Sequence, residues 1–327
     1  MKKLYFLLFL ILQLSSCKFQ KKEISFYHWK SKAIYSDTIK KALSYSKTDT
    51  IYMHYFDIKK IPPNNINPIY ILKEVDSSFS NFNIIPVIFI SNSVFNEEID
   101  VESLSNKIDK LITDISIHNF KKEFKTIQLD CDWTQSTKND YFYLIKLLDQ
   151  KYKINVTIRL HQIKFKDKTG VPPANKGTLM LYNVGELANE DENSLLETRI
   201  VKEYINNSSK YPLTLDVALP LYSQTVLINN HGNIRLINDN CKNELLEDSF
   251  HFKQLKDNLF TVENDTLFKG FYLSKGFKIK IEELTEDEII NSYKVIENSK
   301  LKTANIIFYH LDDKVLNNLN KIIEKLN

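Results

Sequence analysis

Short apolar runs alternate with amphipathic stretches along most of the chain. The runs that predict strands cover residues 24–29, 50–57, 84–91, 126–131, 154–161, 178–183, 213–220 and 304–310. The stretches with helical periodicity cover residues 36–46, 100–118, 137–152, 193–206 and 313–326. Eight strands alternating with helices are typical of a closed (β/α)8 barrel, the TIM barrel. We therefore predict an α/β protein of this class over residues 24–327.

The alternation is interrupted in three places. Pro62-Pro63 and Pro172-Pro173 fall in the connections after the second and fifth strands, and we expect loops there with at most a short helix. Residues 221–302 contain short alternating pieces such as Val226-Leu227-Ile228, without a low-complexity run. This segment predicts a small α+β insertion between strands 7 and 8.

The first residues have the pattern of an export signal. A basic start, Met1-Lys2-Lys3, precedes an apolar run that is too short to span a bilayer and ends in Ser15-Ser16-Cys17. The cysteine at this position resembles the lipobox of bacterial lipoproteins, in which it is acylated and becomes the first mature residue. We therefore expect a signal peptide at 1–16, a lipidated tether at 17–23 and an extracytoplasmic protein anchored to a membrane of the cell envelope. A secreted protein with an unmodified Cys17 is the alternative.

Composition narrows the range of partners. The 327 residues are 43% hydrophobic, which is enough for one large core, and the formal net charge is +3. Arginine occurs only at positions 159, 199 and 235, so the guanidinium forks that recognise phosphates and bases are scarce, and we expect no nucleic-acid partner. Cys131 and Cys241 remain after lipidation; they could pair, although the sequence favours a buried thiol at Cys131.

The most informative segment is Ile127–Thr134, a strand that ends in acidic side chains. Alternation places Gln128, Asp130, Asp132 and Thr134 on one face, and such a polar row is costly to bury unless it lines a site. Two nearby carboxyl groups shift each other's pKa, which is a common basis for acid–base chemistry. A helix cap at Asp132 and Thr134, before the helix predicted from residue 137, is the structural alternative.

In a (β/α)8 barrel the chemistry lies at the carboxyl ends of the strands. There we predict substrate-binding side chains at Trp29, Asp57, Trp133, Arg159, His161, Tyr182, Asn183, Tyr222 and Tyr309. An inward arginine needs a carboxylate partner, and Asp130 or Asp132 could supply it for Arg159. Trp29 and Trp133 could stack on a sugar ring or simply close the barrel. Aromatic rings beside carboxylates favour a carbohydrate ligand.

Four segments together resemble family 18 glycoside hydrolases, the chitinase family. They are Asp130-Cys131-Asp132-Trp133-Thr134, Met180-Leu181-Tyr182-Asn183, Ala218-Leu219-Pro220-Leu221-Tyr222 and Phe308-Tyr309-His310. The resemblance implies a barrel that acts on a carbohydrate, with Asp132 at the position that orients an acetamido group and with an insertion between strands 7 and 8. It also shows two departures: Thr134 stands where the family has its catalytic Glu, and Asn183 stands where it has an Asp.

The motifs and the resemblance together give two candidate catalytic residues and three possible functions. If the protein is a hydrolase, Asp132 is the expected acid or base and Asp130 its electrostatic partner, with Asp130 paired to Arg159. A non-enzymatic barrel that binds a glycan or a protein is the alternative. A metal-dependent hydrolase is a second alternative, because histidines and aspartates lie near the strand ends, but no close ligand spacing appears. We expect no cofactor.

Overall fold

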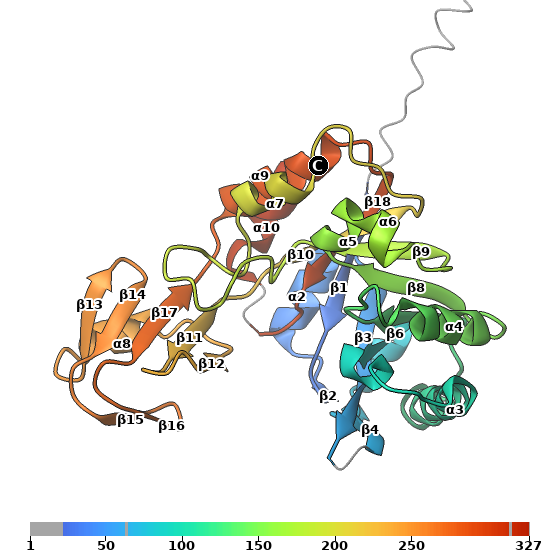
Figure 1. Ribbon diagram of the computed structural model, residues 1–327, viewed down its shortest axis with the longest axis horizontal. Helices are drawn as coiled ribbons and strands as arrows, with labels where there is room; N and C mark the ends of the chain where they lie inside the picture. The colour runs from blue at the N-terminus through green and yellow to red at the C-terminus, as the bar shows by residue number, and fades with distance from the viewer. Residues whose placement is uncertain (1–21, 63–64, 314–315, 327) are drawn as a thin grey trace, which may run out of the picture.

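Eight parallel strands form a closed barrel in the computed structural model, which describes residues 22–62, 65–313 and 316–326. The barrel closes because β1 pairs with both β3 and β18 (Figure 1). Its strands are β1 (Ile24–His28), β3 (Thr50–Ile61), β6 (Asn83–Ile90), β7 (Thr126–Asp130), β8 (Lys153–Ile158), β9 (Lys176–Met180), β10 (Leu215–Pro220) and β18 (Thr303–Tyr309). Each overlaps a predicted run, and the predicted (β/α)8 class is confirmed.

Helices surround the barrel (Figure 1). They are α2 (Asp37–Ser46), α3 (Val101–Phe120), α4 (Lys138–Leu148), α5 (Leu160–Lys164), α6 (Lys166–Thr169), α7 (Thr198–Tyr204), α9 (Glu286–Glu297) and α10 (Leu316–Leu326). The two proline-containing connections have no long helix, as predicted. Between β3 and β6 lie β4 (Asn65–Ile69), β5 (Glu74–Val75) and the 3-10 helix η1 (Ser77–Asn81), with β5 pairing to β2 (Lys32–Ala33), and a second 3-10 helix, η2 (Asn92–Phe95), follows β6. Short α5 and α6 fill the connection from β8 to β9.

The two faces of the barrel strands carry different side chains. On β7 and just beyond it, Ile127, Leu129, Cys131 and Trp133 belong to the large apolar core that includes the helices. Gln128 instead points into the barrel, where its side chain accepts a 2.7 Å hydrogen bond from the Tyr27 hydroxyl across from β1 and donates a 2.9 Å bond to Thr178. The predicted alternation along this strand is therefore present. It places apolar side chains on the outer face of the strand and hydrogen-bonded polar side chains inside the barrel.

A second sheet lies to one side of the barrel (Figure 1). In the chain its strands come after β10 and before α9. Its antiparallel order is β12-β11-β17-β14-β13, and a separate hairpin and one helix accompany it. These elements are β11 (Gln224–Ile228), β12 (Ile234–Ile237), α8 (Lys242–Glu247), β13 (Phe252–Lys256), β14 (Leu259–Val262), β15 (Thr266–Phe268), β16 (Phe271–Leu273) and β17 (Lys278–Glu282). They have an apolar core of their own, with Leu227, Phe252, Phe260 and Ile279 buried in it. We call residues 224–282 the insertion sheet.

From the sequence we predicted that residues 221–302 all belong to the insertion, with no helix that packs on the barrel among them. The structure has α9 there, and this helix contributes Ile289, Ile290, Tyr293 and Ile296 to the barrel core. The helix begins with Thr285, whose side chain accepts a hydrogen bond from the Glu288 amide. The last part of the segment is therefore the barrel helix that precedes β18.

Two further observations concern the chain as a whole. Cys131 and Cys241 are both free and buried, and they belong to different apolar cores, so they do not form a disulfide. No helix in the described ranges combines the length and apolar character needed to cross a membrane. The predicted signal peptide and Cys17 lie outside the described residues.

Candidate functional site

Asp130 ends β7 and lies deep in the mouth of the barrel, by which we mean the end where the parallel strands finish. Its side chain accepts a 2.7 Å hydrogen bond from the Thr157 hydroxyl on β8, and the residue is only 5% exposed. Its pKa is raised to about 6, because the effect of burial, together with the charge of Asp132, outweighs the opposing charge of Arg159 and the hydrogen bond from Thr157. Asp130 therefore holds its proton to a higher pH than an ordinary aspartate.

Asp132 is bound by Arg159 in a two-bond fork. The distances are 2.6 Å from Nε to Oδ1 and 3.1 Å from Nη2 to Oδ2. Nη1 of Arg159 donates a further bond of 3.4 Å to the Tyr182 carbonyl. Burial alone would lower the pKa of Arg159, but the hydrogen bonds and the charge of Asp132 leave it raised. The carboxylate partner of Arg159 is therefore Asp132, and the predicted pairing with Asp130 is wrong.

Aromatic rings from β1, β9, β10 and β18 form the other side of the mouth. Tyr309 stacks on Tyr182 with ring centres 4.8 Å apart, and Tyr222 contacts the Tyr309 ring edge-on with ring centres 5.4 Å apart. Trp29 stacks on His54 at 4.6 Å. These contacts hold the rings in place before any ligand arrives, which reduces the entropy that binding would cost.

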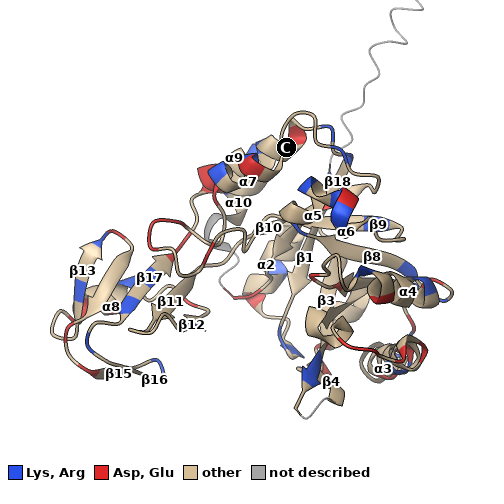
Figure 2. Cartoon of the chain, in the orientation of Figure 1, with Lys and Arg blue, Asp and Glu red and all other residues tan. Residues whose placement is uncertain are grey.

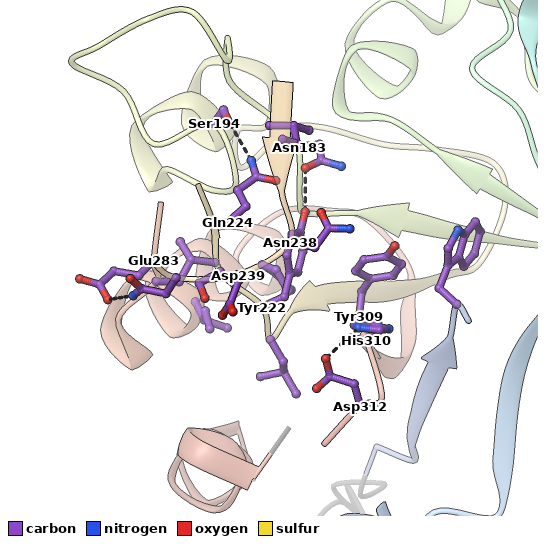
Figure 3. Close-up of a pocket in the computed structure, with 18 of the residues that line it drawn as sticks. Asn183, Ser194, Tyr222, Gln224, Asn238, Asp239, Glu283, Tyr309, His310 and Asp312 are labelled. Atoms are coloured by element: carbon purple, nitrogen blue, oxygen red, sulfur yellow. Dashed lines mark hydrogen bonds and ion pairs between the residues drawn. The ribbon is translucent and has the colours of Figure 1, made fainter. Parts of the chain in front are cut away.

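A cavity of about 1040 Å³ opens between this aromatic side of the mouth and the insertion sheet (Figure 3). The barrel contributes Trp29, Asn183, Tyr222, Tyr309 and His310 to its lining. The Tyr222 hydroxyl donates a 2.8 Å hydrogen bond to Oδ1 of Asn183, which joins the ends of β9 and β10 (Figure 3). Of the predicted residues, Trp29, Asn183, Tyr222 and Tyr309 thus line one cavity.

The acidic pair does not line this cavity. Asp130 and Asp132 belong to the β7 side of the mouth, whereas the cavity lies at the ends of β9, β10, β18 and β1. Tyr182 lies between the two regions, since its ring contacts Tyr309 and its carbonyl contacts Arg159. The site therefore has an acidic part around Asp132, whose side chain is 44% exposed, and a larger aromatic part.

Two predicted substrate-binding residues are not placed as the sequence predicted. Trp133 is fully buried, stacks on Tyr141 at 5.4 Å, and donates a 3.0 Å hydrogen bond to the Thr169 carbonyl, so its assignment as a stacking platform is wrong. The physical reason is alternation: Trp133 is on the outer face, with the core, one step out of phase with Asp132. His161 is not on the strand at all, because β8 ends at Ile158 and His161 is an exposed residue of α5.

Asp57 is buried near the mouth but already has two partners. Its carboxylate lies 2.7 Å from Nε2 of His54 and 3.1 Å from Nζ of Lys59. Because His54 also supports the Trp29 ring, Asp57 acts on the cavity through these neighbours. We therefore assign Asp57 a supporting role and no direct contact with a ligand.

Thr134 lies in the turn before α4, whose N-cap is Thr137, so the predicted helix cap at Asp132 and Thr134 is wrong. Its amide donates a 2.9 Å hydrogen bond to the Thr137 hydroxyl, and that hydroxyl reaches Asn92 at 2.6 Å. These bonds form the turn that leads into α4. Asp132 takes no part in them and is held by Arg159 instead.

Several cavity residues were not predicted as ligand contacts. The insertion sheet and the segments beside it supply Asn238, Asp239, Asn240 and Glu283, and a segment after β18 supplies Asp312. Glu283 accepts a 2.8 Å hydrogen bond from Asn240, and His310 lies 3.1 Å from Asp312 (Figure 3). The only sequence signal for the first group was the polar run Asn238-Asp239-Asn240, which is equally typical of a turn.

The metal-dependent alternative finds no support in the described ranges. No group of three or more His, Cys, Asp or Glu side chains there is arranged to hold a metal ion. His28, one of the histidines near the strand ends, has another role. It is 1% exposed and packs edge-on against Phe79, and burial lowers its pKa to about 3, so it is neutral.

Comparisons with known proteins agree with the fold. No family model matches the chain, and no curated protein sequence matches it. Among solved structures, it is similar to the C-terminal domain of a protein from Desulfitobacterium hafniense assigned as a chitinase (TM-score 0.52, 10% identity, 94% of this chain and 100% of that one). It is also similar to a chitinase from Bacteroides thetaiotaomicron (TM-score 0.50, 11% identity, 93% and 95%). The spore cortex-lytic enzyme SleL of Bacillus cereus has a TM-score of 0.47 at 10% identity, covering 93% and 74%.

The similarity to the two chitinases shows the fold: the chain has a (β/α)8 barrel like theirs. At these identities the likeness concerns the fold, and the activity has to be argued from the site.

Proposed function

We propose that this protein is a lipid-anchored carbohydrate-binding barrel of the cell envelope that holds a glycan at its mouth without hydrolysing it. The observation that carries the proposal is the cavity of about 1040 Å³, with fixed aromatic rings on the barrel side and both amide and carboxylate side chains on the insertion side. Sugar rings offer apolar faces for stacking and hydroxyl groups for hydrogen bonds, and this lining provides both kinds of partner.

We expect no hydrolysis because of the partners that the carboxyl groups on the barrel side have. Glycoside hydrolysis needs a carboxylic acid that protonates the leaving oxygen and a second carboxylate or an equivalent nucleophile. Asp132 is bound in a fork by Arg159, and Asp57 is bound to His54 and Lys59. Thr134, at the position of the family's acid, has only a hydroxyl group, which is far too weak an acid to protonate the leaving oxygen.

Hydrolysis remains a second candidate because of one observation. The pKa of Asp130, raised to about 6, leaves part of this group protonated near neutral pH, as a general acid requires. Its 5% exposure and its hydrogen bond with Thr157 place it away from the cavity, and this geometry favours the binding function.

The ligand class is part of the proposal. The solved structures of the same fold are named as chitinases, so chitin oligosaccharides are the first ligands to test, followed by other neutral β-linked oligosaccharides. Isothermal titration should detect binding to the wild-type protein, and Tyr309→Ala should weaken it at least tenfold, because this ring joins the aromatic contacts of the cavity.

A matched control is available on the surface. Tyr45 is 40% exposed on α2 and does not line the cavity, so Tyr45→Ala should bind as the wild type does. Equal binding by wild type and Tyr309→Ala would contradict the location of the site, and the absence of binding across the panel would contradict the function.

A further inference from the structure

Lysines gather at the end of the barrel opposite the mouth. Because all eight strands are parallel, the connections that lead into the strands meet at this end, which we call the base. The lysines there are Lys47, Lys121, Lys122, Lys125, Lys151, Lys153, Lys210, Lys300 and Lys302, and all are exposed. The acidic residues in the same connections are Asp49, Glu123 and Asp149. The base is therefore markedly basic.

Backbone contacts show that these lysines share one rim. The Lys153 amide donates to the Lys125 carbonyl at 2.8 Å, and the Leu215 amide donates to the Lys302 carbonyl at 2.8 Å. Lysines from different connections therefore lie around the same end of the barrel, and Figure 2 shows basic residues at the starts of β8 and β9 and near β18.

Most of these charges are not neutralised within the protein. Among the described residues, Lys151 has carboxylate partners in Asp109 and Glu123. Elsewhere on the base, no ion pair in the described ranges involves Lys125, Lys300 or Lys302. Charges that the fold leaves unpaired on one face are available to an external anionic surface.

Two segments at the opposite end are acidic. The segment from Leu181 to Glu197, which follows β9 at the mouth, carries Glu186, Glu190, Asp191, Glu192 and Glu197 and no basic residue. The segment 91–100, which follows β6, carries Glu97, Glu98 and Asp100 and no basic residue. An anionic surface would therefore attract the base and repel these two segments of the mouth.

The start of the described chain is at the base. Lys22 contacts Glu297 and Tyr293 near the end of α9, and Glu23 binds Ile306 at the start of β18 through its carbonyl. Only four residues separate Lys22 from Cys17 in the sequence. A chain of this length spans at most about 18 Å when fully extended, so a lipid on Cys17 would bring the base close to the bilayer.

We propose that the base of the barrel is a membrane-binding face that lies on anionic phospholipid headgroups and directs the mouth away from the bilayer. This inference rests on the lipid anchor of the proposed function. The anchor determines the distance to the bilayer, and the lysines determine which face of the barrel turns toward it, since juxtamembrane lysines are attracted to anionic lipids. The glycan cavity is then presented to the outside of the membrane.

The test uses the full-length lipidated protein on two kinds of vesicle, neutral phosphatidylcholine and phosphatidylcholine with about one third phosphatidylglycerol. Flotation reports the anchor, and amide hydrogen exchange of residues 121–125 reports contact of the base. We expect flotation with both vesicles and exchange at least about twofold slower on the anionic vesicles only. Salt at 0.5 M should reverse the difference, because it shortens the screening length well below about 8 Å.

Charge reversal provides the matched comparison. Lys300→Glu with Lys302→Glu should abolish the slower exchange while flotation continues, whereas Lys253→Glu with Lys275→Glu on the insertion sheet should leave it unchanged. Flotation with equal exchange on both vesicles would overturn the membrane face and leave the anchor intact. Absence of flotation from both vesicles would overturn the anchor, and the membrane face with it, without bearing on glycan binding.

Discussion

Asp132 and Arg159 are joined by two hydrogen bonds, of 2.6 and 3.1 Å, across the ends of neighbouring strands β7 and β8. A planar guanidinium bound to both oxygens of a carboxylate stabilises its ionised form. The aspartate that sequence alone marks as the principal acid or base is thus bound through both oxygens by an arginine whose side chain is 21% exposed.

The first prediction concerns the stability of this pair. Asp132→Asn should lower the free energy of unfolding by about 1–2 kcal/mol, because it leaves the Arg159 charge without its partner and the site is only partly buried. Urea denaturation at pH 7 measures the change. Asp114→Asn, at an exposed position of α3, is the control and should change stability by less than about 0.5 kcal/mol. Equal effects of the two variants would contradict the account of the pair.

The second prediction concerns the pH dependence that Asp130 causes. Its pKa is raised from 3.8 to about 6 in the folded protein, so the folded state binds the proton more tightly than the unfolded chain does. The contribution of this proton to stability is complete below pH 4 and is lost as the pH rises through 6, with a total of about 3 kcal/mol.

Asp130→Asn removes this titration and can keep the hydrogen bond from Thr157 through its amide oxygen. The stability of the wild type relative to the variant should therefore fall by about 2–3 kcal/mol between pH 4 and pH 7.5, as followed by denaturation at several pH values. A constant difference across this range would show that Asp130 has an ordinary pKa.

The third prediction separates the two tryptophans. Trp133→Phe should destabilise the fold by about 1–2 kcal/mol, because it removes the hydrogen bond to Thr169 and part of the packing on Tyr141, while glycan affinity stays unchanged. Trp29→Ala should weaken glycan binding by at least about tenfold, since Trp29 lines the cavity. Titration and thermal unfolding of both variants check these outcomes, and a loss of affinity in Trp133→Phe would return that residue to the site.

The sequence predicted more of the barrel than of the site, for a physical reason that residues of β7 and β8 illustrate. Burial requires period-two alternation, so Leu129 and Gln128 could be assigned to opposite faces from the sequence. The end of β8 at Ile158 depends on tertiary contacts. The predicted strand ran to residue 161, so His161 was assigned to the strand although it belongs to α5. Nothing in the pattern near residue 240 indicated that the insertion sheet approaches Tyr309, because such contacts join distant segments.

The fourth prediction concerns the anchor. Cys17→Ser should abolish membrane fractionation while leaving the fold unchanged, because Cys17 precedes the first strand. Membrane fractions washed with high salt and probed for the protein provide the measurement. A variant that still sediments with washed membranes would show that lipidation at this cysteine is not what anchors the protein.

The central claim is that the mouth of the barrel binds a glycan and does not cleave it. Saturation-transfer difference NMR on a chitin tetrasaccharide reads both properties in one sample, because ring protons near the protein gain signal and new reducing ends appear as anomeric resonances. We expect transfer from the protein to the sugar protons, loss of this transfer in Tyr309→Ala, and no new anomeric signals over a day. Transfer accompanied by growing reducing-end signals in the wild type, absent in Asp130→Asn, would contradict it and identify the protein as a hydrolase.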